Sequence, residues 1–336
     1  MRNNGIKLIA AALTLAAVLV SDGCKKSTVV KTTTTAPSGP VELKVKWPAG
    51  RHMVQNFDLK ENNEMTVPGT PAPMRQTMNM EQKYGMTVLP DRSDGKHEVE
   101  FEFLSSHMMM KMGEKVMMDT DSSAKLPNGQ PNPAGDVFKK LSGAKIRIVL
   151  DASNQVESVE GIDALQSRLG GGGANDPTGA LKSMFKEDYF KQMMNFGRYM
   201  PTKAVAPGDT WPVQLEVEMG NMGTMVLDYT YTLKNWELRN DRYCAHIGVE
   251  GTIKTKPGDN PQMPGMNIAI DNGTSSGETW FDLDMGMYVE TSLNQEMKMT
   301  ITVPNRRGGG APNAPKNMTI TGDVNQVINI KLDSVQ

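Results

Sequence analysis

Methionine is the residue type in this chain with the most obvious capacity to bind a ligand. The chain has 27 Met, against 8 Phe, 7 Tyr and 4 Trp. The densest cluster is His107-Met-Met-Met-Lys-Met112, and thioether and imidazole ligands favour Cu(I). In an extended strand Met108, Met110 and Met112 share one face while His107 lies on the other. One hypothesis is therefore a copper site that contains His107, Met108, Met110 and Met112 and is completed from another strand.

The same residue type supports two other hypotheses. Met is soft and adaptable, so a Met-lined surface suits variable apolar partners such as lipid acyl chains. The candidate lining residues of such a surface are Met78, Met80, Met109, Met225, Met297 and Met299. Alternatively, Met fills a solid core in place of Leu and Phe, and the protein has a structural or protein-interaction role without a ligand.

Catalytic patterns are weak throughout the sequence. The alternating Glu98, Glu100 and Glu102 fit a solvated strand face better than a pair of acid–base carboxylates. No G-x-S-x-G nucleophile motif occurs, and the glycines of 170–173 are not followed by the Lys-Ser/Thr of a phosphate loop. The histidines show no metalloprotease spacing; they are His52, His97, His107 and His246. We expect no enzymatic activity and no cofactor.

The N-terminal residues predict export. Arg2 and Lys7 precede an apolar run from Leu8 to Val20, and Gly23-Cys24 follows. This run is shorter than the about 20 residues that a membrane-spanning helix needs, and it fits the core of a secretory signal. We therefore predict a signal peptide at residues 1–23 and lipid attachment at Cys24.

The rest of the chain divides into a linker and a folded part. Residues 24–40 are rich in Thr and Pro, which is typical of a flexible linker. Residues 41–336 are long enough to bury a sizeable core. The net charge of −2 gives no basic excess, so nucleic acid is not an expected partner.

Apolar and polar residues alternate over long stretches, most clearly in Met74–Val88 and Met287–Val303. Alternation of this length predicts half-buried antiparallel strands. Asp284-Met-Gly286 and Asp271-Asn-Gly273 have the composition of turns. A helical segment is expected at about 156–200. The predicted fold is mainly β with a helical insert (α+β): a large curved antiparallel sheet or open barrel wrapped around a few helices.

Several short motifs resemble a family of uncharacterised bacterial lipoproteins that carry a domain of unknown function. They are Trp47-Pro-Ala-Gly50, the Met-rich strand and Asp-Gly turn of Met74–Gly95, Ile148–Val156, Pro207-Gly-Asp-Thr-Trp211 and Phe281–Gly286. The long alternating strands also resemble, more distantly, the half-barrel lipoprotein carriers of bacterial envelopes. By resemblance to the sorting rule of Gram-negative lipoproteins, Lys25-Lys26 after Cys24 implies the outer membrane.

These observations together predict a non-enzymatic lipoprotein of the bacterial cell envelope, anchored by Cys24 in the outer membrane and facing the periplasm. Its partners would be the membrane, through the lipid anchor, and a hydrophobic ligand on the concave face of the sheet. A structural or protein-interaction lipoprotein and a copper-binding protein are the alternatives.

Overall fold

The computed structural model describes residues 35–120, 139–170, 194–218, 223–256, 267–304 and 317–336, together with Gly135, Glu187, Phe190 and Lys191. The predicted signal peptide, Cys24 and most of the linker lie outside these residues, as do most of residues 171–193 of the expected helical segment.

One antiparallel sheet of twelve strands organises the described chain. The strands are β1 (His52–Thr66), β2 (Met74–Val88), β3 (His97–Met112), β4 (Lys115–Asp119), β5 (Lys145–Leu150), β6 (Val156–Glu160), β7 (Thr210–Glu218), β8 (Thr224–Arg239), β9 (Arg242–Lys256), β10 (Asn267–Asp282), β11 (Met287–Pro304) and β12 (Asn317–Val335). The helices are α2 (Ile162–Arg168) and the 3₁₀ turn η1 (Phe196–Tyr199).

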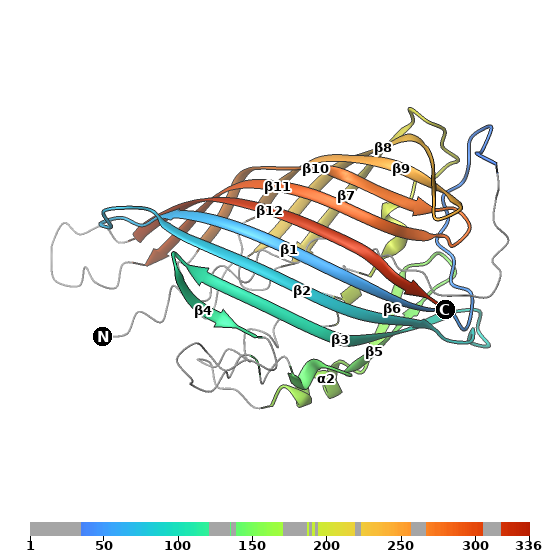
Figure 1. Ribbon diagram of the computed structural model, residues 1–336, viewed down its shortest axis with the longest axis horizontal. Helices are drawn as coiled ribbons and strands as arrows, with labels where there is room; N and C mark the ends of the chain where they lie inside the picture. Colours follow the sequence, from blue (N-terminus) through green and yellow to red (C-terminus); the bar gives the residue numbers. More distant parts are fainter. Residues whose placement is uncertain are drawn as a thin grey trace.

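The sheet runs in the order β6-β5-β3-β2-β1-β12-β11-β10-β9-β8-β7, with β4 paired to β3. The first and last strands are therefore neighbours, and Figure 1 shows β1 and β12 side by side in the middle of the sheet. The sheet curves so strongly that β7 passes behind β10 and β11 in that view. Its end strands β6 and β7 do not pair with each other, so the predicted curved, mainly β fold is confirmed.

Glycines on the concave face allow part of this curvature. Gly251, Gly273 and Gly277 pair with large neighbours, and a Cβ added at Gly273 would lie 2.8 Å from the Ile253 Cβ. Because the missing Cβ lets a neighbouring side chain lie over the glycine backbone, β9 and β10 can bend tightly here. Asp271-Asn-Gly273, which we expected to form a turn, instead lies within β10 beside a register shift between Ile270 and Asn272.

Two apolar clusters fill the concave face. The larger spans β1, β2 and β7–β12 and includes Leu59, Leu227 and Ile328. The smaller lies where the sheet meets the helices, and there Trp47 packs edge-on against Phe196 at 5.2 Å. Helices α2 and η1 therefore pack against the curved sheet through this smaller cluster.

The helical segment begins later than expected. Residues from 156 were predicted to be helical, but Val156–Glu160 forms β6, an edge strand that pairs with β5. Long-range pairing with β5 overrides the local pattern at these residues. Helix α2 then covers Ile162–Arg168, and its Leu165 is buried.

The Pro207–Trp211 motif forms the turn that leads into β7. Asp209 accepts a hydrogen bond from the Ala206 backbone at 2.8 Å, and Gly208 has a positive φ of 97°. Trp211 is then buried, and its indole donates to the Tyr199 carbonyl at 3.0 Å. The motif thus links the start of β7 to η1.

Candidate functional site

Five of the six candidate lining methionines lie together on the concave face. All five belong to the larger apolar cluster and are 1–4% exposed; they are Met78, Met80, Met225, Met297 and Met299. Met109 does not join them, because it pairs with the exposed Asn79 and so occupies the other face of the sheet. The predicted methionine lining is thus brought together except for Met109.

The candidate copper ligands divide between the two faces. Met108 and Met110 pair with the concave-face residues Met80 and Met78. His107 lies on the other face, where its Nε2 is 3.1 Å from Asp119 Oδ1. Met112 shares the face of Met110 and pairs with Gln76. Within the described part of the chain, no group of three or more His, Cys, Asp or Glu side chains could hold a metal ion.

A row of polar residues crosses the concave face at right angles to the strands. Each member is the direct register partner of the next, from strand to strand. Starting at β3, the row contains Met110, Met78, Glu61, Gln326, Gln295, Ser275, Gly251 and Tyr229. We call the four neighbours Glu61, Gln326, Gln295 and Ser275, together with Asn63 and Tyr229, the polar row.

Glu61 is the charged member of the polar row and is 1% exposed. Its two carboxylate oxygens accept hydrogen bonds from Asn63 Nδ2 and Gln326 Nε2, each at 2.6 Å. Burial raises the pKa of Glu61 to about 6, although these two hydrogen bonds pull it down. The carboxyl therefore changes its charge close to neutral pH.

Two amide oxygens of the polar row are left without a partner. Because an ionised carboxylate only accepts hydrogen bonds, Asn63 and Gln326 must turn their NH₂ groups towards Glu61. Asn63 Oδ1 and Gln326 Oε1 then accept no hydrogen bond from any described residue, and these side chains are 5% and 2% exposed. Buried polar atoms without a partner are uncommon and costly.

Tyr229 closes the other end of the polar row. Its hydroxyl accepts a hydrogen bond from Gln295 Nε2 at 3.3 Å, although β8 and β11 are separated by two strands. This reach is possible because its partner in β9 is Gly251, over which the ring lies. Burial raises the pKa of Tyr229, so the phenol is neutral at physiological pH.

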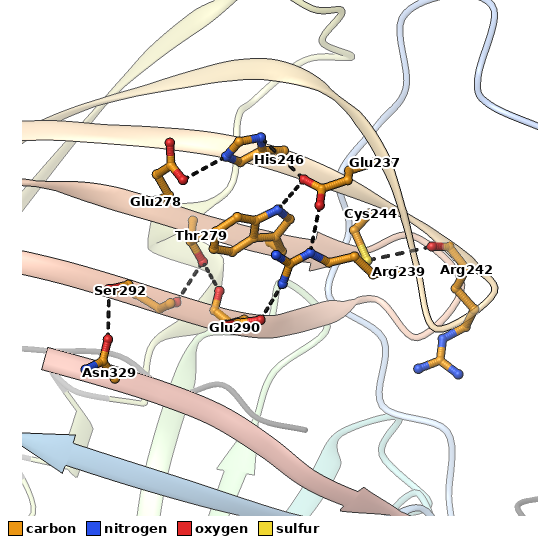
Figure 2. A network of polar contacts seen from close by, with 12 residues as sticks. Glu237, Arg239, Arg242, Cys244, His246, Glu278, Thr279, Glu290, Ser292 and Asn329 are labelled. Atoms are coloured by element: carbon orange, nitrogen blue, oxygen red, sulfur yellow. Dashed lines mark hydrogen bonds and ion pairs between the residues drawn. The ribbon is translucent and has the colours of Figure 1, made fainter. Parts of the chain in front are cut away.

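A second polar network surrounds Trp280 on the outer face of the sheet. The Arg239 guanidinium carbon lies 3.8 Å from the ring centre, and the His246 ring stacks on it at 4.7 Å. Figure 2 shows Glu237, Arg239 and Glu290 joined in one chain of contacts, with Glu278 beside His246. These charges partner one another, so the network stabilises the outer face of the sheet.

Two glutamines of the polar row have a signal in the sequence, and one is Gln326, which lies at the parity of the apolar residues Val324 and Ile328. In the alternation of Met287–Val303, Gln295 occupies the parity of the buried apolar residues. Glu61 has a weaker signal, because its neighbours from Lys60 to Glu64 are all polar and define no apolar face.

Comparison with solved structures gives weak similarities. The chain is similar to DynF from the dynemicin biosynthesis pathway of Micromonospora chersina (7% identity, 93% of this chain, 95% of that chain, TM-score 0.19). It is also similar to an outer membrane channel from Pseudomonas putida (7%, 88% and 100%, 0.24) and to a DUF1329 family protein from Desulfovibrio piger (8%, 83% and 85%, 0.14). TM-scores this low carry no argument about function.

No curated protein matches the chain. In the described part of the chain, none of the helices has the length and apolar character needed to cross a membrane. A family model does match residues 94–308, more than half of the chain, and its description is a family of unknown function. The sequence resemblance to a family of uncharacterised proteins is thereby confirmed, and the chain belongs to the family of unknown function DUF6263.

Proposed function

We propose that this protein is a non-enzymatic lipoprotein of the bacterial envelope, anchored through Cys24, that binds a hydrophobic molecule on its concave face. The observation that carries the proposal is the shared location of Met78, Met80, Met225, Met297 and Met299 in one cluster on that face. Flexible thioether side chains adapt to ligands of variable shape at low cost. A curved sheet with such a lining suits an acyl chain.

Ligand entry requires the concave face to open. The five methionines are almost fully buried, so the side chains of β7 and β8 must separate from those of β1 and β2 to admit a ligand. Both pairs of strands contribute to the same cluster. Methionine favours such rearrangement, because its unbranched side chain repacks more readily than Leu or Ile.

The structural or protein-interaction alternative receives less support from the surface. An interaction protein of this kind is expected to expose an apolar patch. The large hydrophobic side chains that are exposed among the described residues are Leu238, at the β8–β9 hairpin, and Val327 of β12. These two residues are far apart in sequence and on different strands, and they do not define a patch.

Binding of an environment-sensitive fluorescent fatty acyl probe tests the proposal. The protein from residue 25 to 336, which contains every described residue, is titrated with the probe beside Met297→Gln and Met109→Gln. Both substitutions add a polar amide of similar length, but Met297 lies in the concave cluster and Met109 on the other face. We expect Met297→Gln to weaken probe binding by about tenfold, which corresponds to about 1.4 kcal/mol, and Met109→Gln to leave it unchanged. Equal effects of the two substitutions, or no probe binding by the parent protein, would contradict the proposal.

A further inference from the structure

We infer that the polar row is a head-group site, which holds the polar end of an amphipathic ligand that donates hydrogen bonds and carries no negative charge. The inference rests on the proposed function, because it identifies which class of hydrophobic molecule the concave face takes. The ligand would have two parts. Its alkyl chain would contact the methionines, and its hydroxyl or ammonium head would bind at Glu61, Asn63 and Gln326.

The polar row lies in the middle of the concave face, next to the methionine lining. Its members Glu61, Gln326 and Gln295 have apolar residues of the same face on both sides along their strands. On one side, Leu59 of β1 pairs with Met80 and Ile328. On the other, Val324 of β12 pairs with Met297 and with Asn63, through which the polar row extends at β1. The buried polar groups of Glu61, Gln326 and Gln295 therefore lie among apolar side chains, and Met78 and Met297 of the methionine lining are their direct or next register neighbours. That arrangement matches a molecule with one polar end and one apolar end.

The polar row also has a defined hydrogen-bonding character. The two donors that face Glu61 are used, since Asn63 Nδ2 and Gln326 Nε2 both bond its carboxylate. Three polar atoms of the row have no partner among the described residues: Asn63 Oδ1 and Gln326 Oε1, which can only accept hydrogen bonds, and Ser275 Oγ, which can accept or donate. A ligand that satisfies the two amide oxygens beside Glu61 must donate hydrogen bonds, as a hydroxyl or an ammonium group does.

The polar row also carries a charge. Glu61 is buried, and no basic side chain of the described residues pairs with it; the groups that hydrogen-bond to it there are both neutral amides. An anionic head, such as a carboxylate or a phosphate, would bring a second negative charge beside it in an apolar environment, which is strongly unfavourable. An ammonium head would instead neutralise the carboxylate. The expected order of affinity is amine, then alcohol, then carboxylate.

Native mass spectrometry with three probes of equal chain length tests this order. Dodecylamine, dodecanol and dodecanoate are titrated below their micellar concentrations against the protein from residue 25 to 336 at about pH 8, where Glu61 is ionised. We expect the amine to bind about tenfold more tightly than the carboxylate, as a charge-assisted hydrogen bond predicts.

Two matched variants locate the site. Gln326→Met removes the amide from the polar row without shortening the side chain. Gln55→Met makes the same change in β1, on the same concave face as Glu61 but outside the polar row. Gln55 is equally buried but lies six residues from Glu61, about 20 Å along the strand. We expect Gln326→Met to reduce the preference for the amine to about twofold or less, and Gln55→Met to preserve it. The denaturation midpoint of each variant is measured first, so that loss of fold is not taken for loss of selectivity.

The outcomes separate this inference from the proposed function. If all three probes bind equally, or if the carboxylate binds best, the head-group site is wrong while binding on the concave face stands. If Gln55→Met changes the preference as much as Gln326→Met, the polar row is not the site. If none of the probes binds and the fluorescent acyl probe also fails, both the inference and the proposed function are overturned. The wild-type order of affinity alone decides the inference if the variants do not fold.

Discussion

Replacing Glu61 by Gln is expected to stabilise the protein at alkaline pH. Glu61 is 1% exposed, and its pKa of about 6 in the folded protein exceeds the ordinary value of 4.5 because burial disfavours the ionised form. A pKa difference of this size corresponds to about 2 kcal/mol. The ionised carboxylate therefore lowers the free energy of unfolding by about 2 kcal/mol above pH 6, relative to a neutral group of the same shape.

The sign follows from the direction of the pKa change. Because the folded-state pKa is raised, the folded protein binds a proton more tightly than the unfolded chain. The cost is therefore fully present above the folded-state pKa of about 6, and it disappears as the pH falls below about 4.5. Glutamine at position 61 carries no charge. Its NH₂ group can donate a hydrogen bond to Gln326 Oε1, which has no partner among the described residues of the wild type, once the Gln326 amide turns.

Urea unfolding of the wild type and of Glu61→Gln at about pH 8 and about pH 4.5 measures the effect. We expect the variant to gain about 1–2 kcal/mol at the higher pH and less than about 0.5 kcal/mol at the lower. Glu64→Gln is the matched control, since Glu64 is exposed on the same strand and bonds Arg75 at the surface. A variant that is less stable than the wild type at about pH 8, or a gain that does not change with pH, would refute the reasoning.

Three further predictions address the bend, the polar row and the anchor. Gly273→Ala should lower the free energy of unfolding by about 1–3 kcal/mol, because the new Cβ would lie 2.8 Å from the Ile253 backbone oxygen. Gly85→Ala is the control: its Cβ would have no atom nearer than 3.5 Å, so the free energy of unfolding should change by less than about 0.5 kcal/mol in the same urea assay. Tyr229→Phe should cost about 1 kcal/mol in thermal unfolding, since it removes a buried hydroxyl that accepts a hydrogen bond, and an unchanged stability would argue against that bond. Cys24→Ser should abolish incorporation of radiolabelled palmitate in cells, and continued labelling would place the acyl chain on another residue.

The strands were predictable where their alternation is local. The alternation of Met287–Val303 matches β11 almost residue for residue, and the turn at Asp284–Gly286 joins it to β10 as expected. The local pattern is sufficient for these elements, because the alternation of apolar and polar residues shows which face of the strand is buried.

The faces of neighbouring strands were less predictable. Met109 was grouped with Met78 and Met80, but the register places Met108 and Met110 beside them instead. The pairing of β2 with β3 shifts by one residue between Lys83 and Tyr84, and such a shift reverses which residues share a face. This register depends on contacts between strands, which the sequence of one strand does not contain.

The polar row was missed for a related reason. Glu61 looks like a solvated residue in its own strand, and only the pairing of β1 with β12, across almost the whole chain, brings it beside Gln326. Gln295 and Gln326 carry a local signal, because each is a polar residue at the parity of buried apolar residues in its strand.

The most direct test of the account is native mass spectrometry of the protein exported to a periplasm and purified without detergent, using residues 25–336 behind a secretory signal. If the concave face binds hydrophobic molecules, the protein carries added mass that denaturation releases as an alkyl or acyl compound, and Met297→Gln carries less of it than Met109→Gln. A protein that has only its own mass, and that keeps this mass after incubation with lipid, would contradict the account.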